Sequence, residues 1–186
     1  MMWNLPNILT FSRLLMVPIF AVCFFYHYYL AALLIFFLAG LTDLVDGAIA
    51  RFLNQRSALG AALDPVADKT LMWAAFICLA TVRVIPWWLV YLTLIKDAIV
   101  LGGVGLLKWR KVPFTYQPIL WSKCATLAQI VTGTFGLIDF VLPGYAFWRY
   151  PISDFVMGGI YVTGVLVFVT TLEYIRKGLE ILQSAR

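Results

Sequence analysis

Six long apolar stretches, separated by proline, glycine or charged residues, decide what kind of fold this chain can adopt. They run from Leu14 to Leu30, Ala31 to Val45, Ala61 to Val82, Trp87 to Leu107, Ile119 to Leu142 and Ile152 to Tyr174. The first two are separable only by the polar cluster at Tyr26 to Tyr29. A helix needs about 20 apolar residues to cross a bilayer. A chain with 63% hydrophobic and 12% charged residues cannot cover itself with a water-facing surface. We therefore predict an all-α integral membrane protein with six transmembrane helices in one domain, residues 1–186.

The first thirteen residues form a separate pattern. Between Met1 and Arg13, apolar residues are interspersed with polar Asn4, Asn7 and Thr10, as in an amphipathic helix that lies in the membrane interface. The segment lacks the basic region and the small-residue cleavage site of a signal peptide. We expect an interfacial helix over residues 1–13, followed by a first span that remains in the mature protein.

The basic residues predict the orientation, because cytoplasmic loops retain Lys and Arg. With the N-terminus inside, most basic residues, Arg13 and Arg51 among them, fall on or near the cytoplasmic side, and only Arg83 and Arg149 clearly fall outside. Both termini are then cytoplasmic, in a bacterial inner or cell membrane. The basic residues are too few and too scattered for a nucleic-acid groove, so we expect lipids and no nucleic acid as partners.

Four aspartates interrupt the apolar sequence where the second span ends and the third begins. Asp43, Asp46, Asp64 and Asp68 make up four of the nine acidic residues and lie within 26 positions. Asp43 and Asp46 are three residues apart, and Asp64 and Asp68 are four apart, so each pair occupies one face of a helix. The two pairs can therefore converge on one site. The predicted orientation of the spans places this site on the cytoplasmic side.

A divalent cation would stabilise this cluster, because ionised carboxylates are costly in hydrocarbon unless they are paired or bound to metal. Ligation by carboxylate oxygens alone suits Mg²⁺ or Mn²⁺, whereas zinc prefers Cys or His ligands. The alternative is that the aspartates form ordinary salt bridges with Arg51, Arg56 and Lys69. Three nearby cations give little reason for four carboxylates on two helices, so we favour the metal site.

Small and basic residues around the aspartates indicate the ligand. Gly47 allows close approach on the second span, Arg51 is suited to a phosphate or a cytosine edge, and Gly60 can let a nucleotide lie against the backbone. Metal beside basic residues suggests a diphosphate substrate, whose oxygens metal ions bridge during displacement.

Read as a pattern, residues 43–68 are D-x2-D-G-x2-A-R-x8-G-x3-D-x3-D, complete at all eight fixed positions. This pattern resembles the signature of the CDP-alcohol phosphatidyltransferase family. The resemblance implies six transmembrane helices around a polar cavity open to the cytoplasm, usually in a homodimer. It also implies two Mg²⁺ or Mn²⁺ ions, a CDP-linked lipid such as CDP-diacylglycerol as donor, and CMP as leaving group.

The resemblance further assigns roles to individual residues. It makes Asp43, Asp46, Asp64 and Asp68 metal ligands, and it makes Asp68 also the general base that deprotonates the acceptor hydroxyl. The positions that it implies contact the donor nucleotide are Asn7, Thr10, Gly47, Arg51 and Ser57, and Gly60 belongs to the same predicted donor site.

The sequence indicates the acceptor alcohol less clearly than it indicates the donor. The segments NLPNILTFSR and DPVADK look more like the phosphatidylglycerophosphate synthase and eukaryotic-type cardiolipin synthase branches than the inositol or choline branches. We predict glycerol 3-phosphate, with phosphatidylglycerol as the alternative that would yield cardiolipin. Candidate contacts to an acceptor phosphate are Lys96, Arg110 and Lys123, although Arg110 is equally well explained as a cytoplasmic anchor.

Lys96 and Asp97 form a second ionisable pair inside the fourth span. Adjacent residues on a helix do not face each other, so we expect each to have another partner, with Asp97 orienting a neighbour. Relatives commonly carry Arg in place of Lys96, and Lys lacks the bidentate geometry of Arg toward phosphate.

Two other classes compete with the transferase interpretation. A membrane prenyltransferase also holds a metal-diphosphate with aspartates, but it usually needs about nine spans. A small cation transporter would bind the ion itself through intramembrane aspartates, and it would not require Gly47, Arg51, Ser57 and Gly60 at these spacings.

Overall fold

The computed structural model describes the backbone of residues 5–53, 58–109, 120–144, 146–147 and 150–184. Side chains are described for 11–42, 69–105, 120–144, 146, 150–181 and 183. The helices in this part are α1 (Leu5–Phe25), α2 (Tyr29–Leu53), α3 (Ala58–Thr81), α4 (Trp87–Trp109), α5 (Leu120–Val141) and α6 (Ile152–Ser184). Two short strands, β1 (Ala146–Phe147) and β2 (Tyr150–Pro151), pair antiparallel before α6.

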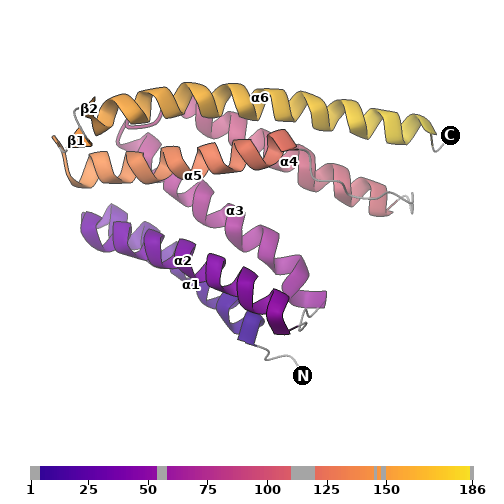
Figure 1. The fold of residues 1–186 in the computed structure, drawn as a ribbon, viewed down its shortest axis with the longest axis horizontal. Helices are drawn as coiled ribbons and strands as arrows, with labels where there is room; N and C mark the ends of the chain where they lie inside the picture. The colour runs from indigo at the N-terminus through magenta and orange to yellow at the C-terminus, as the bar shows by residue number, and fades with distance from the viewer. Residues whose placement is uncertain (1–4, 54–57, 110–119, 145, 148–149, 185–186) are drawn as a thin grey trace.

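The helices form two groups that α3 joins. Helix α1 packs against α2 and α3, whereas α6 packs against α4 and α5, and α3 also contacts α4 and α5. Figure 1 shows α3 running obliquely between the two groups. The α1–α2, α3–α4 and α5–α6 connections lie at one end, and the start of α1 and the end of α6 lie toward the other. The apolar core between the groups includes Phe20, Phe36, Phe76, Leu79 and Leu137.

Three helices contain described segments long and apolar enough to cross a membrane, namely Trp87–Gly105, Leu120–Val141 and Ile152–Ile181. The described parts of the other three contribute shorter apolar segments, Phe11–Phe25, Tyr29–Thr42 and Lys69–Thr81. Many large apolar side chains on these helices are exposed. The helical architecture thus agrees with an integral membrane protein.

Several predicted boundaries are confirmed. The break predicted at Tyr26 to Tyr29 separates α1 from α2, and His27 there has a left-handed backbone with φ of 66°. Helices α4 and α6 begin at Trp87 and Ile152, the residues where the fourth and sixth apolar stretches begin. The β1–β2 pair was not predicted, because two-residue strands carry no detectable alternation of polar and apolar residues.

The interfacial position expected for residues 1–13 stays a prediction, but the helix boundary expected at Arg13 is absent. Helix α1 runs without a break from Leu5 to Phe25 and continues through Arg13. The prediction treated the charge of Arg13 as a boundary, but this side chain is only 1% exposed and lies inside the bundle. A charge that the bundle buries gives the helix no reason to end.

Helix α6 continues beyond the predicted end at Tyr174. Its 33 residues span about 50 Å, more than the roughly 30 Å of a bilayer core. In the added turns Arg176 Nε donates to Glu180 Oε1 at 3.0 Å, an i,i+4 pair that supports an exposed helix.

Close packing of α5 on α6 depends on Gly159. A Cβ placed there would lie 2.6 Å from Thr132 Oγ1, and that hydroxyl is hydrogen-bonded to Thr163 Oγ1 at 2.9 Å in a buried position. We expect Gly159→Ala to destabilise the protein by about 1–3 kcal/mol through overpacking, measured by thermal unfolding in detergent. Gly158→Ala is the matched control, because no atom lies within 4 Å of its added Cβ. Equal stability of the two variants would contradict this packing.

Candidate functional site

The four aspartates occupy matching depths in two consecutive helices. Asp43 and Asp46 belong to α2, Asp64 and Asp68 belong to α3, and their side chains lie outside the described ones. Asp43 lies ten positions before the last residue of α2, and Asp68 lies ten positions after the first residue of α3, about 15 Å along each helix. Asp46 and Asp64 lie closer to the same two ends, at about 10 Å. This backbone arrangement is compatible with a shared site for the two pairs.

The residues predicted to bind the donor nucleotide lie near the same end of the bundle. Asn7 and Thr10 are in the first turns of α1, Gly47 and Arg51 are in the last turns of α2, and Gly60 is in the first turn of α3. Figure 1 shows these ends of α1, α2 and α3 near one another. Ser57, like the predicted acceptor contact Arg110, lies outside the described residues.

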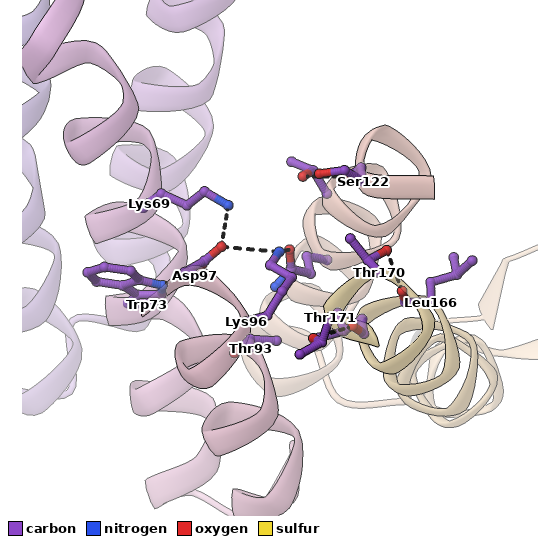
Figure 2. A network of polar contacts seen from close by, with 12 residues as sticks. Lys69, Trp73, Thr93, Lys96, Asp97, Ser122, Leu166, Thr170 and Thr171 are labelled. Atoms are coloured by element: carbon purple, nitrogen blue, oxygen red, sulfur yellow. Dashed lines mark hydrogen bonds and ion pairs between the residues drawn. The ribbon is translucent and has the colours of Figure 1, made fainter. Parts of the chain in front are cut away.

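Asp97 of α4 is the centre of a buried ionic network that reaches α3. Its Oδ1 lies 2.6 Å from Lys69 Nζ, and its Oδ2 accepts a hydrogen bond of 2.9 Å from Trp73 Nε1. Figure 2 shows both donors pointing from α3 toward this carboxylate. Asp97 is only 3% exposed, so its charge depends on these partners.

Lys96, the neighbour of Asp97, connects the network to α5. Its Nζ lies 3.2 Å from Asp97 Oδ1 and donates to Gln129 Oε1 at 3.1 Å. The prediction that each residue of the pair has another partner is confirmed. The prediction that the two do not face each other is wrong, because the long lysine side chain bends back to the adjacent carboxylate when the surroundings exclude water.

Burial also bears on the predicted role of Lys96 at an acceptor phosphate. The side chain is 2% exposed, and its ammonium already has a carboxylate and an amide oxygen as partners. The nearby hydroxyls of Thr93, Thr170 and Thr171 donate to carbonyls of their own helices (Figure 2). Lys96 therefore holds α4 and α5 together in this arrangement.

The network also orients α3. Lys69 and Trp73 are one turn apart on one face of the helix, and both bind the same carboxylate. Asp64 and Asp68 lie on a different face, about 140° around the axis from the face of Lys69 and Trp73. A carboxylate that holds two residues of one face restricts the rotation of α3, and it thereby restricts the direction of the aspartate face as well.

Sequence reasoning identified Lys96 and Asp97 but missed Trp73 and Gln129, and it considered Lys69 only as a partner for the aspartates. The ammonium of Lys69 binds Asp97 of α4. A signal for Gln129 was present, since a glutamine in the middle of an apolar span usually bonds across helices. Trp73 carries no such signal, because an indole is common in any span.

Two further predictions concern the metal site and the residues that contact the acceptor alcohol. Among the side chains that the structure describes, no group of three or more His, Cys, Asp or Glu residues could hold a metal ion; the four aspartates fall outside that set. Lys123, a predicted acceptor contact, lies in the first turn of α5, and its side chain is exposed.

A protein-family model described as CDP-alcohol phosphatidyltransferase matches residues 3–172. A probable phosphatidylglycerophosphate synthase of Mycobacterium tuberculosis (strain ATCC 25618 / H37Rv) is 33% identical over 95% of this chain and 82% of its own length.

Two eukaryotic relatives show higher identity over a shorter part of the chain. A cardiolipin synthase (CMP-forming) of Homo sapiens is 40% identical over 60% of this chain. A cardiolipin synthase (CMP-forming) / mitochondrial hydrolase fusion protein of Schizosaccharomyces pombe (strain 972 / ATCC 24843) is 45% identical over 60% of this chain. The match covers 37% of the length of the human protein and 19% of the length of the Schizosaccharomyces pombe protein.

Proposed function

The chain belongs to the CDP-alcohol phosphatidyltransferase family, and we propose that it transfers a phosphatidyl group from CDP-diacylglycerol to a glycerol-type lipid alcohol, with release of CMP. The observation that carries the proposal is the complete eight-residue pattern, with its aspartate pairs at equal depths in α2 and α3. A cation transporter would explain the aspartates but not the family membership.

The donor set fits divalent metal, because four carboxylates on two adjoining helix ends supply only the hard oxygen ligands that Mg²⁺ and Mn²⁺ prefer. Asp43, Asp46, Asp64 and Asp68 would hold two ions, which supply charge stabilisation to the diphosphate when bound. Arg51, Gly47, Ser57 and Gly60, with Asn7 and Thr10, would bind the cytidine diphosphate part of the donor.

Asp68 acts as the general base in this proposal. It accepts the proton of the acceptor hydroxyl, and the resulting alkoxide oxygen attacks the β-phosphorus of the donor. A new phosphodiester bond forms, the bond from that phosphorus to the bridging oxygen breaks, and CMP leaves with the bonding electron pair.

We propose phosphatidylglycerol as the acceptor, which makes the product cardiolipin. Glycerol 3-phosphate carries a phosphate monoester, which needs dedicated cations in the acceptor site. Lys96 was predicted to supply one of them, but its side chain is buried against Asp97 and Gln129. A phosphodiester carries less charge and requires fewer cations. The two relatives that are named cardiolipin synthases also have higher identity than the mycobacterial synthase, although over a shorter part of the chain.

Glycerol 3-phosphate, the acceptor that the sequence favoured, is the second candidate. One observation supports it: the relative named phosphatidylglycerophosphate synthase matches 95% of this chain and most of its own length. The cytoplasmic position of the site, the bacterial membrane and the homodimer belong to both versions of the proposal.

An acceptor panel separates the candidates. We expect detergent-purified protein with CDP-diacylglycerol and Mg²⁺ or Mn²⁺ to release CMP when phosphatidylglycerol is added, with cardiolipin formed in equal amount. CMP release with glycerol 3-phosphate and none with phosphatidylglycerol would reject the first acceptor in favour of the second. Mg²⁺ flux into liposomes without CMP from either acceptor would contradict the whole reaction class.

A further inference from the structure

A pocket of about 560 Å³ lies between the α3–α4 turn and the first turns of α6. Its volume falls within the roughly 300–1,000 Å³ that is typical of small-molecule sites. The turn follows the end of α3 at Thr81, thirteen residues after Asp68 and therefore about 20 Å along the helix. The pocket is thus separate from the aspartate end, and Figure 1 shows the α3–α4 turn and the start of α6 at the opposite end of the bundle.

Arg83 is the one charged residue among the described residues that line this pocket. It follows the end of α3 with a φ of 62°, its amide donates to Ala80 O at 3.1 Å, and Val84 N donates to Leu79 O at 3.0 Å. Glycine is the residue that this left-handed helix-ending position prefers. Backbone geometry alone therefore gives no reason for an arginine, which points to a role for its side chain.

His27 is the other described residue, apart from glycine, with a left-handed backbone, and it differs from Arg83 in the contacts of its side chain. Its Nδ1 is hydrogen-bonded to Tyr29 Oη, so its ring has a partner within the fold. Among the residues that the structure describes, no carboxylate lies within ion-pair distance of the Arg83 guanidinium, and the side chain is exposed. An anion from outside the chain can therefore reach it.

Aromatic side chains form the wall of the pocket beside Arg83. Trp87 stacks on Tyr91 with ring centroids 5.9 Å apart. Trp88 lies over Gly164 of α6, where an added Cβ would come within 2.8 Å of the indole, so the wall is built on a close α4–α6 contact. Tryptophan and tyrosine beside a cation are typical of the membrane–water boundary.

An exposed apolar stripe continues from the pocket along α6. Tyr161 lines the pocket, and Val165, Phe168 and Leu172 follow it on the same helix face, each exposed by more than half. A hydrocarbon chain can lie along this stripe while a polar group occupies the pocket.

We propose that this pocket binds the phosphate headgroup of an anionic phospholipid from the leaflet opposite the aspartate site. The guanidinium of Arg83 pairs with the phosphate in the bidentate geometry that arginine favours, Trp87 and Trp88 flank the glycerol region, and one acyl chain follows α6. The aromatic lining and the stripe select a lipid over a free phosphate ion. The site is independent of the acceptor that the enzyme uses.

Lipid binding to the full-length protein in detergent, measured by native mass spectrometry, tests the proposal. Phosphatidylserine serves as the anionic probe, because it is not a proposed substrate, and phosphatidylcholine serves as the comparison. We expect Arg83→Gly to weaken phosphatidylserine binding roughly tenfold or more, since it removes a charge-assisted contact. The same variant relieves the left-handed backbone, so its melting temperature is expected to equal or exceed that of the wild type, and its CMP release is expected to match it.

His27→Gly is the matched control, because it relieves the same backbone conformation without removing a cation from the pocket, and it should bind phosphatidylserine like the wild type. Arg83→Gln, which keeps a side chain of similar length, should lose binding to the same extent as Arg83→Gly. Equal phosphatidylserine affinity in wild type and both Arg83 variants would overturn the proposal. Equal binding of phosphatidylcholine, or displacement of the lipid by millimolar inorganic phosphate, would also overturn it.

Discussion

Replacing Asp68 by asparagine is expected to lower the rate of CMP release by about 10³-fold. The amide of asparagine cannot accept the proton of the acceptor hydroxyl, and general-base catalysis typically contributes 10²–10⁴-fold. Asp43, Asp46 and Asp64 remain on the two helices. Binding of CDP-diacylglycerol should therefore stay detectable while turnover is lost, which separate binding and CMP assays measure.

The control for this variant is Asp154→Asn. Asp154 is an exposed aspartate in the first turn of α6, at the end of the bundle opposite the Asp68 site, so the same chemical change there should leave CMP release unchanged. Wild-type turnover in Asp68→Asn would exclude Asp68 as the base. Loss of donor binding together with turnover would instead assign Asp68 to the donor site alone.

Replacing Asp97 by asparagine is expected to destabilise the protein by about 3–5 kcal/mol. The change removes the one carboxylate of the described network. Among the described side chains it then leaves Lys69 and the almost fully buried Lys96 without a counter-charge. Removal of one member of a buried ion pair typically costs this much, because the remaining charge is uncompensated. For a chain of this size the apparent Tm should fall by roughly 10 °C.

Two further variants show whether charge pairing is the cause. Adding Lys96→Met to Asp97→Asn should recover part of the lost stability, because the buried ammonium is then absent. Glu180→Gln breaks the exposed Arg176–Glu180 pair and should cost no more than about 0.5 kcal/mol. Strictly additive effects of Lys96→Met and Asp97→Asn would show that the two charges do not interact.

Asp97→Asn also tests how the network positions the aspartates. Asp97 contacts Lys69 and Trp73, which lie on a different face of α3 from Asp64 and Asp68. If Asp97 orients α3, then the folded fraction of this variant should show a lower kcat with donor binding less affected. A purely structural role would lower only the amount of folded protein and leave kcat per folded molecule unchanged.

Residues close together in the chain were enough to predict the helical elements and to propose a chemistry for the aspartate end. The break at Tyr26 to Tyr29, the starts of α4 and α6, and the spacing of the Asp43–Asp68 pattern all depend on residues close together in the chain. Hydrophobic runs and one-turn spacings are local properties, and local properties can be read without knowing which helices meet.

The distant side chains that share a buried space could be identified only from the folded bundle. Sequence spacing predicted that Lys96 and Asp97 would have other partners, but Lys69, Trp73 and Gln129 come from α3 and α5 and are found only by packing. Packing also buried Arg13 within α1, where sequence reasoning had ended a helix, and it joined Arg83 and Trp88 to α6 around a pocket. The physical reason is that the energy of a charge inside a membrane protein depends on its neighbours in space, and several of those neighbours lie on helices far away in the sequence.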